Sequence, residues 1–126
     1  MNTPQSYLIL IIPIITASIA QLLFKRGIST LGKLDFSFTN LFSLIFKILQ
    51  NGLLMTGAVI FGVSFLFYLF SLSKFQLNVI YPIFVSSGIV IVSLASWFFL
   101  KESLSWLQIS GIVIIIFGIF LLATKS

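Results

Sequence analysis

The stretch LNVIYPIFVSSGIVIVSLASWFFL, residues 77–100, contains 24 consecutive residues without a charged side chain. A helix needs about 20 such residues to cross the hydrocarbon core of a bilayer. Because lipid cannot satisfy an open backbone, we expect this segment to be a membrane-spanning helix. Three further uncharged stretches, at 7–24, 53–72 and 104–123, are 18, 20 and 20 residues long. The sequence therefore predicts an all-α integral membrane protein, a bundle of four transmembrane helices.

The composition supports this class. Of the 126 residues, 60% are hydrophobic and 7% are charged, whereas about a quarter of the residues are charged in a soluble domain. So few ionisable groups cannot cover a water-facing surface. Because the four stretches take up most of the chain, we expect a single membrane domain over 1–126 with no separate extramembrane domain.

The absent residue types exclude several functions. The chain has no Cys and no His, which removes thiol nucleophiles, disulfides, thiolate or imidazole metal ligands and the commonest general base. We therefore expect no enzymatic activity, no catalytic residue, no metal and no cofactor. The net charge is +5, but the basic residues are scattered between apolar stretches, which favours anchoring at the membrane edge over nucleic-acid binding.

The longest connection has helical periodicity of its own. Between 36 and 50, apolar residues recur at helical spacing opposite Asn40, Ser43 and Lys47; they are Phe38, Leu41, Phe42, Ile45 and Leu49. This pattern predicts an amphipathic helix lying at the membrane interface. The alternative is an early, hydrated start of the second spanning helix.

The other connections are short, at 73–76 and 101–103, so the helices that they join should be antiparallel neighbours. Glu102 precedes the last helix, where a carboxylate interacts favourably with the positive end of the helix dipole. Ser103 or Ser105 can cap the free amides of that helix.

Basic residues are unevenly divided between the two sides. One side carries five, namely Lys25, Arg26, Lys33, Lys47 and Lys101, and the other carries Lys74 and Lys125. The positive-inside rule then places the five in the cytoplasm and both termini outside. Insertion in both orientations remains an alternative.

Polar residues within the spans are candidates for function, because polar groups are costly in a bilayer. Ser18, Gln21 and Lys25 share one face of the first helix. One face of the third spanning helix carries a second polar stripe, made of Asn78, Tyr81, Pro82, Val85, Ile89, Ser93 and Ser96. Two such faces would form a groove for a ligand with a polar head, and the candidate binding residues are Ser18, Gln21, Lys25, Asn78, Tyr81 and Pro82.

Each candidate also has a structural interpretation. Lys25 can be a snorkelling anchor, Gln21 can bond a neighbouring helix, and Pro82 can simply kink its helix. The serines can be contacts between helices. Both acids, Asp35 and Glu102, fall in connections, which disfavours proton antiport through a buried carboxylate.

Gly111 and Gly118 interrupt the last helix seven residues apart, on one face. Missing side chains let another helix approach closely. We expect these glycines to form a dimer interface; the alternative is packing within the subunit.

Three segments carry a family resemblance: ASIAQLLFK at 17–25, NVIYP at 78–82, and KESLSWLQISG at 101–111, followed by Gly118. In order and spacing they resemble the drug/metabolite transporter superfamily, of EamA type, across almost the whole chain. The resemblance implies a four-helix subunit of the inner (plasma) membrane that works as a homodimer or as a heterodimer with a homologous subunit.

Two groups of this superfamily have four helices. Small multidrug-resistance exporters carry an essential Glu in the first helix, eight residues before a Lys, and this sequence has Ala17 at that place. Aminoarabinose-lipid flippase subunits are similar to this chain in a Gln-x3-Lys pattern, here Gln21 and Lys25, and a Tyr-Pro pair, here Tyr81 and Pro82.

The second likeness implies a flippase that moves an undecaprenyl-phosphate-linked sugar among membrane lipids, from one leaflet to the other. Alternatives are an exporter of small cations or metabolites and a non-transporting membrane adaptor of a glycosyltransferase.

Overall fold

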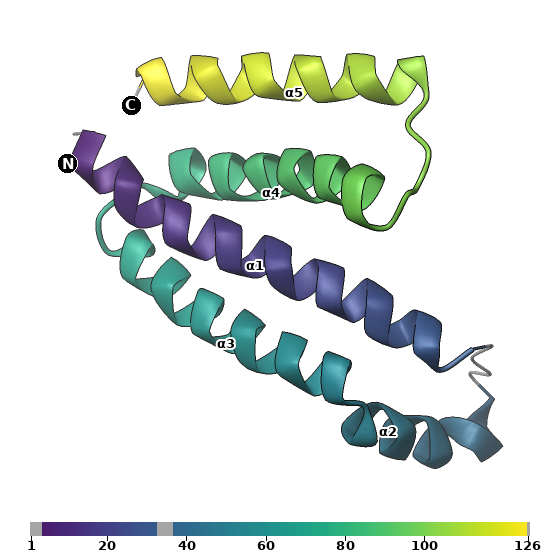
Figure 1. Cartoon of the computed structure of the whole chain (residues 1–126). Helices are drawn as coiled ribbons and strands as arrows, with labels where there is room; N and C mark the ends of the chain where they lie inside the picture. Colours follow the sequence, from purple (N-terminus) through teal and green to yellow (C-terminus); the bar gives the residue numbers. More distant parts are fainter. Residues whose placement is uncertain (1–3, 33–36, 126) are drawn as a thin grey trace.

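The computed structural model describes residues 4–32 and 37–125, and all the regular structure in these ranges is helical (Figure 1). The elements are α1 (Pro4–Thr30), the short 3-10 helix η1 (Phe38–Asn40), α2 (Leu41–Gln50), α3 (Gly52–Leu72), α4 (Leu77–Phe99) and α5 (Trp106–Lys125). In the described part of the chain, α1, α3, α4 and α5 are long and apolar enough to cross a membrane. The predicted all-α fold with four spanning helices is thus confirmed.

The first helix extends well beyond its apolar stretch. It continues to Thr30 instead of ending near 24, because Lys25 and Arg26 lie in its last turns, where long charged side chains can reach water. Their side chains are exposed.

The last helix begins at Trp106, two residues later than the predicted start at 104. A capping box fixes this start: the Ser105 N–H donates to Gln108 Oε1 at 2.8 Å, and the Gln108 N–H donates to Ser105 Oγ at 3.2 Å. Of the two candidate capping serines, Ser105 is the one used. Glu102 lies outside the helix.

Helices α1 and α3 form the closest pair in the fold, and glycine makes their approach possible. A Cβ added at Gly57 would stand 3.0 Å from the Phe24 ring and 3.2 Å from Leu23 Cβ. Further along the pair, the buried Ser64 hydroxyl donates to the Pro13 carbonyl at 2.7 Å. Close backbones and a buried hydrogen bond are typical of helix packing in membranes, where apolar contact alone gives little preference for protein over lipid.

One side chain joins the end of α1 to the start of α3. Asn51 is the N-cap of α3, and its Oδ1 accepts from the Leu54 N–H at 3.0 Å. Its Nδ2 donates to Thr30 Oγ1 at 2.9 Å. The segment between Thr30 and Asn51 is therefore held at both ends at one edge of the helix pair.

The amphipathic segment lies within that connection. The segment was expected to start at residue 36, which lies outside the described residues. A 3-10 turn precedes α2. Helix α2 ends at Gln50, as expected. Leu44 is buried, whereas the Phe42 side chain is 86% exposed. Insertion of the exposed side into the membrane interface remains a prediction.

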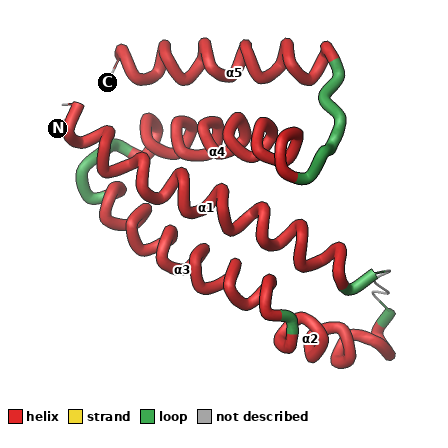
Figure 2. The backbone as a smooth tube through the Cα atoms, viewed as in Figure 1, coloured by secondary structure: helices red, strands yellow, loops and turns green. Residues whose placement is uncertain are grey.

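The four long helices lie in the order α3, α1, α4, α5, an open row (Figures 1 and 2). Among the described helices, α5 contacts only α4. A small core at the N-terminal ends of α1 and α4 contains Leu10, Ile14, Phe75, Ile80 and Ile83. Much of the apolar surface therefore lies outside the core, as expected where lipid is the solvent.

Candidate functional site

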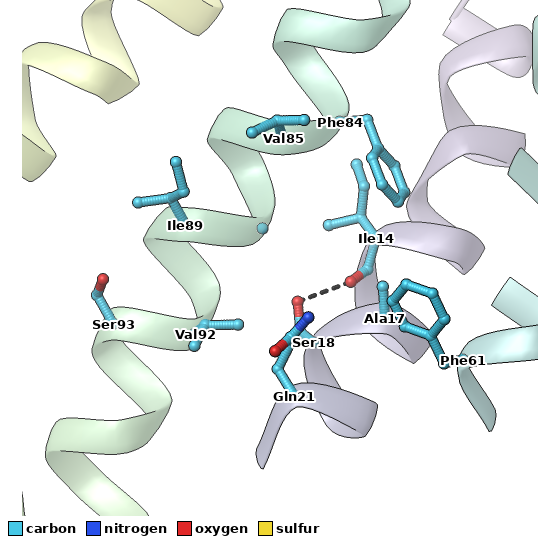
Figure 3. A pocket seen from close by; sticks show the side chains of 11 residues that line it. Ile14, Ala17, Ser18, Gln21, Phe61, Phe84, Val85, Ile89, Val92 and Ser93 are labelled. Atoms are coloured by element: carbon cyan, nitrogen blue, oxygen red, sulfur yellow. Dashed lines mark hydrogen bonds between the residues drawn. The ribbon is translucent and has the colours of Figure 1, made fainter. Parts of the chain in front are cut away.

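A cavity of about 500 Å³ lies between α1, α3 and α4 (Figure 3). Its lining consists of Ile14, Ala17, Ser18 and Gln21 of α1, Phe61 of α3, and Phe84, Val85, Gly88, Ile89, Val92 and Ser93 of α4. The predicted faces of the first and third spanning helices thus meet over part of their length.

The polar groups of the cavity gather toward one end. Ser18 is 3% exposed, and its hydroxyl donates to the Ile14 carbonyl at 2.7 Å, so it is satisfied within its own helix. Gln21 lies one turn further along α1, and among the described residues its amide has no hydrogen-bond partner. Ser93 lines the cavity from α4 at this end. An amide and a hydroxyl are therefore available to a ligand here.

The cavity is lined by neutral side chains, so its polar groups act on a ligand as dipoles and not as charges. None of the residues that line it is ionisable. A bare charge deep in such an apolar space would be strongly disfavoured, whereas a polar uncharged group can hydrogen-bond to the amide and hydroxyl. In the described part of the chain no cluster of potential metal ligands is found.

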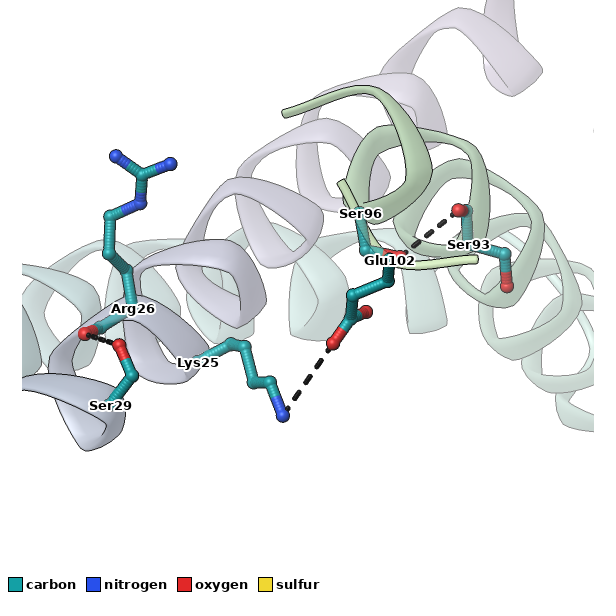
Figure 4. A network of polar contacts seen from close by, with 6 residues as sticks. All are labelled: Lys25, Arg26, Ser29, Ser93, Ser96 and Glu102. Carbon is teal, nitrogen blue, oxygen red and sulfur yellow. Dashed lines mark hydrogen bonds and ion pairs between the residues drawn. The ribbon is translucent and has the colours of Figure 1, made fainter. Parts of the chain in front are cut away.

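Lys25 lies beyond this polar end, one turn after Gln21, and does not line the cavity. Its Nζ is 3.6 Å from Glu102 Oε2, with side-chain exposures of 62% and 46% (Figure 4). Beside this ion pair, the Arg26 guanidinium donates to the Phe99 carbonyl at 3.4 Å. Both contacts tie the end of α1 to the junction of α4 and α5.

The structure gives Glu102 a partner that the sequence did not predict. Its carboxylate pairs with Lys25 of α1, and its interaction with the dipole of α5 stays a prediction. The sequence offered no signal for the contact, because the two residues are far apart along the chain.

The other predicted residues, Asn78, Tyr81 and Pro82, lie near the beginning of α4. Helix α1 runs in the same direction as α4, since Leu10 packs in the core that contains Ile80 whereas Arg26 reaches Phe99.

The two predicted polar groups are therefore at opposite ends of the helix pair. From Asn78 to Ser93 the rise along α4 is about 22 Å. Within one chain the structure brings Ser18 and Gln21 to the cavity, places Lys25 just beyond it, and puts Asn78, Tyr81 and Pro82 at the far end. A single site that combines Lys25 with Asn78 is not formed.

Several cavity residues were not identified from the sequence, notably Phe61, Phe84 and Gly88. In a chain with 15 Phe, two aromatic residues carry no distinguishing signal. Gly88 could have been noticed, because it lies one turn before Val92 in the middle of α4.

Four apolar helices in so short a chain, with a cavity among three of them, define a small multi-pass membrane protein. Residues 42–115 match the family described as Small Multidrug Resistance protein, and the chain belongs to this family. The match covers α2 except its first residue, all of α3 and α4, and the first half of α5.

A relative matches almost the whole chain. It is the probable 4-amino-4-deoxy-L-arabinose-phosphoundecaprenol flippase subunit ArnF of Proteus mirabilis (strain HI4320), 30% identical over 125 residues, which cover 95% of this chain and 92% of the relative. No solved structure matches the chain significantly. Both names describe membrane transport and neither describes an enzyme.

Proposed function

We propose that this chain is one subunit of a dimeric flippase of the inner membrane that moves a polyprenyl-phosphate-linked sugar between leaflets. The observation that carries the proposal is the neutral cavity whose polar end, at Gln21 and Ser93, is followed one turn later by the Lys25 ammonium. The likeness to a phosphoundecaprenol flippase subunit supports this choice of substrate class.

The three parts of such a lipid match three environments of this chain. Sugar hydroxyls can exchange their water for the amide of Gln21 and the hydroxyl of Ser93. The phosphate needs a cation near the headgroup level, and Lys25 provides one. The prenyl tail can stay in the surrounding lipid, because the row of helices is open.

The second polar group belongs to the other end of the same path. We assign Asn78, Tyr81 and Pro82 to contacts with the headgroup at the opposite leaflet from Lys25. Under this proposal, Ser18, Gln21 and Lys25 bind the headgroup on one side of the membrane, and the start of α4 receives it on the other.

The assembly and its orientation complete the proposal. Four helices in an open row do not enclose a path, so a second subunit, identical or homologous, would pack against α5 at Gly111 and Gly118. The end that carries Lys25, Arg26, Lys47 and Lys101 would face the cytoplasm and both termini would lie outside, by the positive-inside rule.

The family description names multidrug resistance, which favours a second candidate, the exporter of small cations considered above. That function needs an anionic group to receive the cation within the membrane, and the cavity lining contains neutral side chains only. Ala17 is one of these lining residues. The lipid substrate is therefore the better match to this site.

The test is headgroup translocation in proteoliposomes that contain the full chain. Gln21→Ala and Lys25→Ala should each slow the flipping of a polyprenyl-phosphate-linked sugar by about tenfold, because each removes a hydrogen bond or charged contact to the headgroup. Matched controls are Gln50→Ala and Lys47→Ala, whose parent side chains are exposed on α2 and do not line the cavity; both should flip at the normal rate. Unchanged flipping in both test variants would rule out this assignment.

A further inference from the structure

The Lys25–Glu102 ion pair is unusual in this chain because acidic residues are so rare. In the described ranges, 4–32 and 37–125, Glu102 is the only acidic residue. Three basic residues belong to the same junction: Lys25 is its partner, Arg26 bonds the Phe99 carbonyl, and Lys101 is its neighbour in the chain. The junction therefore keeps an excess of positive charge after Glu102 has been paired.

The ion pair lies at the polar end of the cavity. On α1, Lys25 comes one turn after Gln21, which lines the cavity. On α4, the Ser96 carbonyl accepts the Glu102 N–H at 3.2 Å, and the Ser96 hydroxyl donates to the carbonyl of Ser93, another lining residue, at 3.1 Å (Figure 4). Both partners are thus anchored one turn beyond the groups that a headgroup would bind.

We infer that Lys25 is an anion site whose occupant in this state is the chain's own Glu102, and that the phosphate headgroup of the lipid displaces this carboxylate. The inference rests on the proposed function. Carboxylate and phosphate oxygens compete for the same ammonium donors. An ion pair this exposed is weak, because water and salt screen it. A phosphate that is also bound through the rest of its lipid can therefore displace the Glu102 carboxylate from Lys25.

Displacement has a mechanical consequence. Helix α5 contacts only α4 among the described helices, and the Lys25–Glu102 pair is a tie between α1 and the connection that leads to α5. Phosphate binding at Lys25 removes this tie. The substrate thereby weakens the attachment of α1 to this junction, where the Arg26–Phe99 hydrogen bond remains.

The first experiment measures binding of farnesyl phosphate, a short isoprenyl phosphate, to the purified full chain by calorimetry in detergent. Glu102→Gln should bind about two- to fivefold more tightly than the natural chain, because it removes a weak competitor from Lys25. Lys25→Gln should bind about tenfold more weakly. Lys47→Gln, which changes an exposed lysine of α2, is the matched control and should bind normally. Equal or weaker binding by Glu102→Gln would overturn the inference.

The second experiment keeps Glu102 and so does not depend on the folding of that variant. Because the chain has no Cys, spin labels can be attached through Ser29→Cys and Ser103→Cys, on exposed residues at either side of the ion pair. Farnesyl phosphate should lengthen the distance between the labels. An unchanged distance would overturn the inference.

Two further ligands identify which chemistry moves the labels. Farnesol has the tail without the charge, and the same lengthening with farnesol would overturn displacement by an anion. Inorganic phosphate at the same concentration has the charge without the tail, and the same lengthening would assign the site to free phosphate instead of a lipid headgroup. Lengthening with farnesyl phosphate alone supports the inference.

Failure of the inference is distinguishable from failure of the proposed function. If the natural chain flips the lipid and Lys25→Ala does not, while Glu102→Gln binds farnesyl phosphate no more tightly, the flippase stands and the displacement of Glu102 is wrong. If neither the natural chain nor Glu102→Gln binds farnesyl phosphate and no lipid is flipped, both are wrong.

Discussion

Lys101 has a backbone conformation that its side chain does not favour. Its φ is +58°, in the left-handed region, directly after the C-cap of α4 at Leu100. This turn allows the Ser96 carbonyl to accept two N–H groups, from Leu100 at 3.0 Å and from Glu102 at 3.2 Å. An L-residue loses stability in this region through the contact of its Cβ with the following carbonyl, and glycine does not. Lys101 therefore introduces local strain at the position that directs Glu102 toward Lys25.

Lys101→Gly should raise the free energy of unfolding by about 0.5–1 kcal/mol, because the relief of left-handed strain exceeds the added freedom of glycine in the unfolded chain. Unfolding in mixed detergent micelles measures the change. Lys101→Ala is the control, since it removes the same charge but keeps the Cβ. Equal stabilisation by Lys101→Ala would show that the charge, and not the backbone, is responsible.

The pair of α1 and α3 depends on the absence of a side chain at one position. Gly57 faces Leu23 and Phe24 at distances that leave no room for a methyl group without movement of these side chains. Gly62, five residues later on the same helix, has open space around it. Glycine is thus required for packing at position 57 of α3, whereas at position 62 the structure leaves room for a side chain.

Gly57→Ala should lower the stability of the protein by about 1–3 kcal/mol, because overpacking shifts the two helices apart. Gly62→Ala is the matched control; it adds the same methyl group to the same helix and should be neutral or slightly stabilising. Unfolding of both variants in detergent makes the comparison. A Gly62→Ala variant that is destabilised as much as Gly57→Ala would exclude packing as the cause.

The molecule as a whole is an open row of helices with α5 at its edge. Neither Gly111 nor Gly118 has an atom within 4 Å of an added Cβ, so packing against another described helix of the same chain does not explain them. They leave a smooth strip on an apolar helix that contacts only α4. This arrangement supports, without testing, the prediction that the two glycines lie at a dimer interface.

Gly118→Leu should weaken dimerisation by about tenfold or more, because a large side chain prevents the close approach of two helices that small residues allow. Energy transfer between labelled subunits in bicelles measures the association, and unfolding of the subunit should be unchanged. Gly62→Leu, at another open glycine, is the control for adding a large apolar residue. An unchanged dimer in Gly118→Leu would contradict the assigned interface.

The class and the local structure of this protein follow from the amino-acid sequence alone. Lipid cannot pair with backbone groups, so each long uncharged stretch had to be a helix, and short connections made neighbouring helices antiparallel. Local chemistry also limited the capping residue of the last helix to Ser103 or Ser105, because a cap bonds to amides only two or three residues away; the structure shows that Ser105 is used. It identified Ser18 and Gln21 as facing a common groove, since residues three or four apart share a side of a helix.

The height along the bundle at which the faces of two helices meet depends on how the helices pack, and the sequence did not predict it. The periodicity of α4 gives the side on which Asn78 and Ser93 lie, but their height relative to Lys25 depends on the direction and shift of α1 against α4. For the same reason the ion pair of Lys25 with Glu102, and the place of Phe61 in the cavity, followed from packing alone. These contacts join residues that are distant in the chain, and a local pattern contains no information about the distance between two helices or their relative shift.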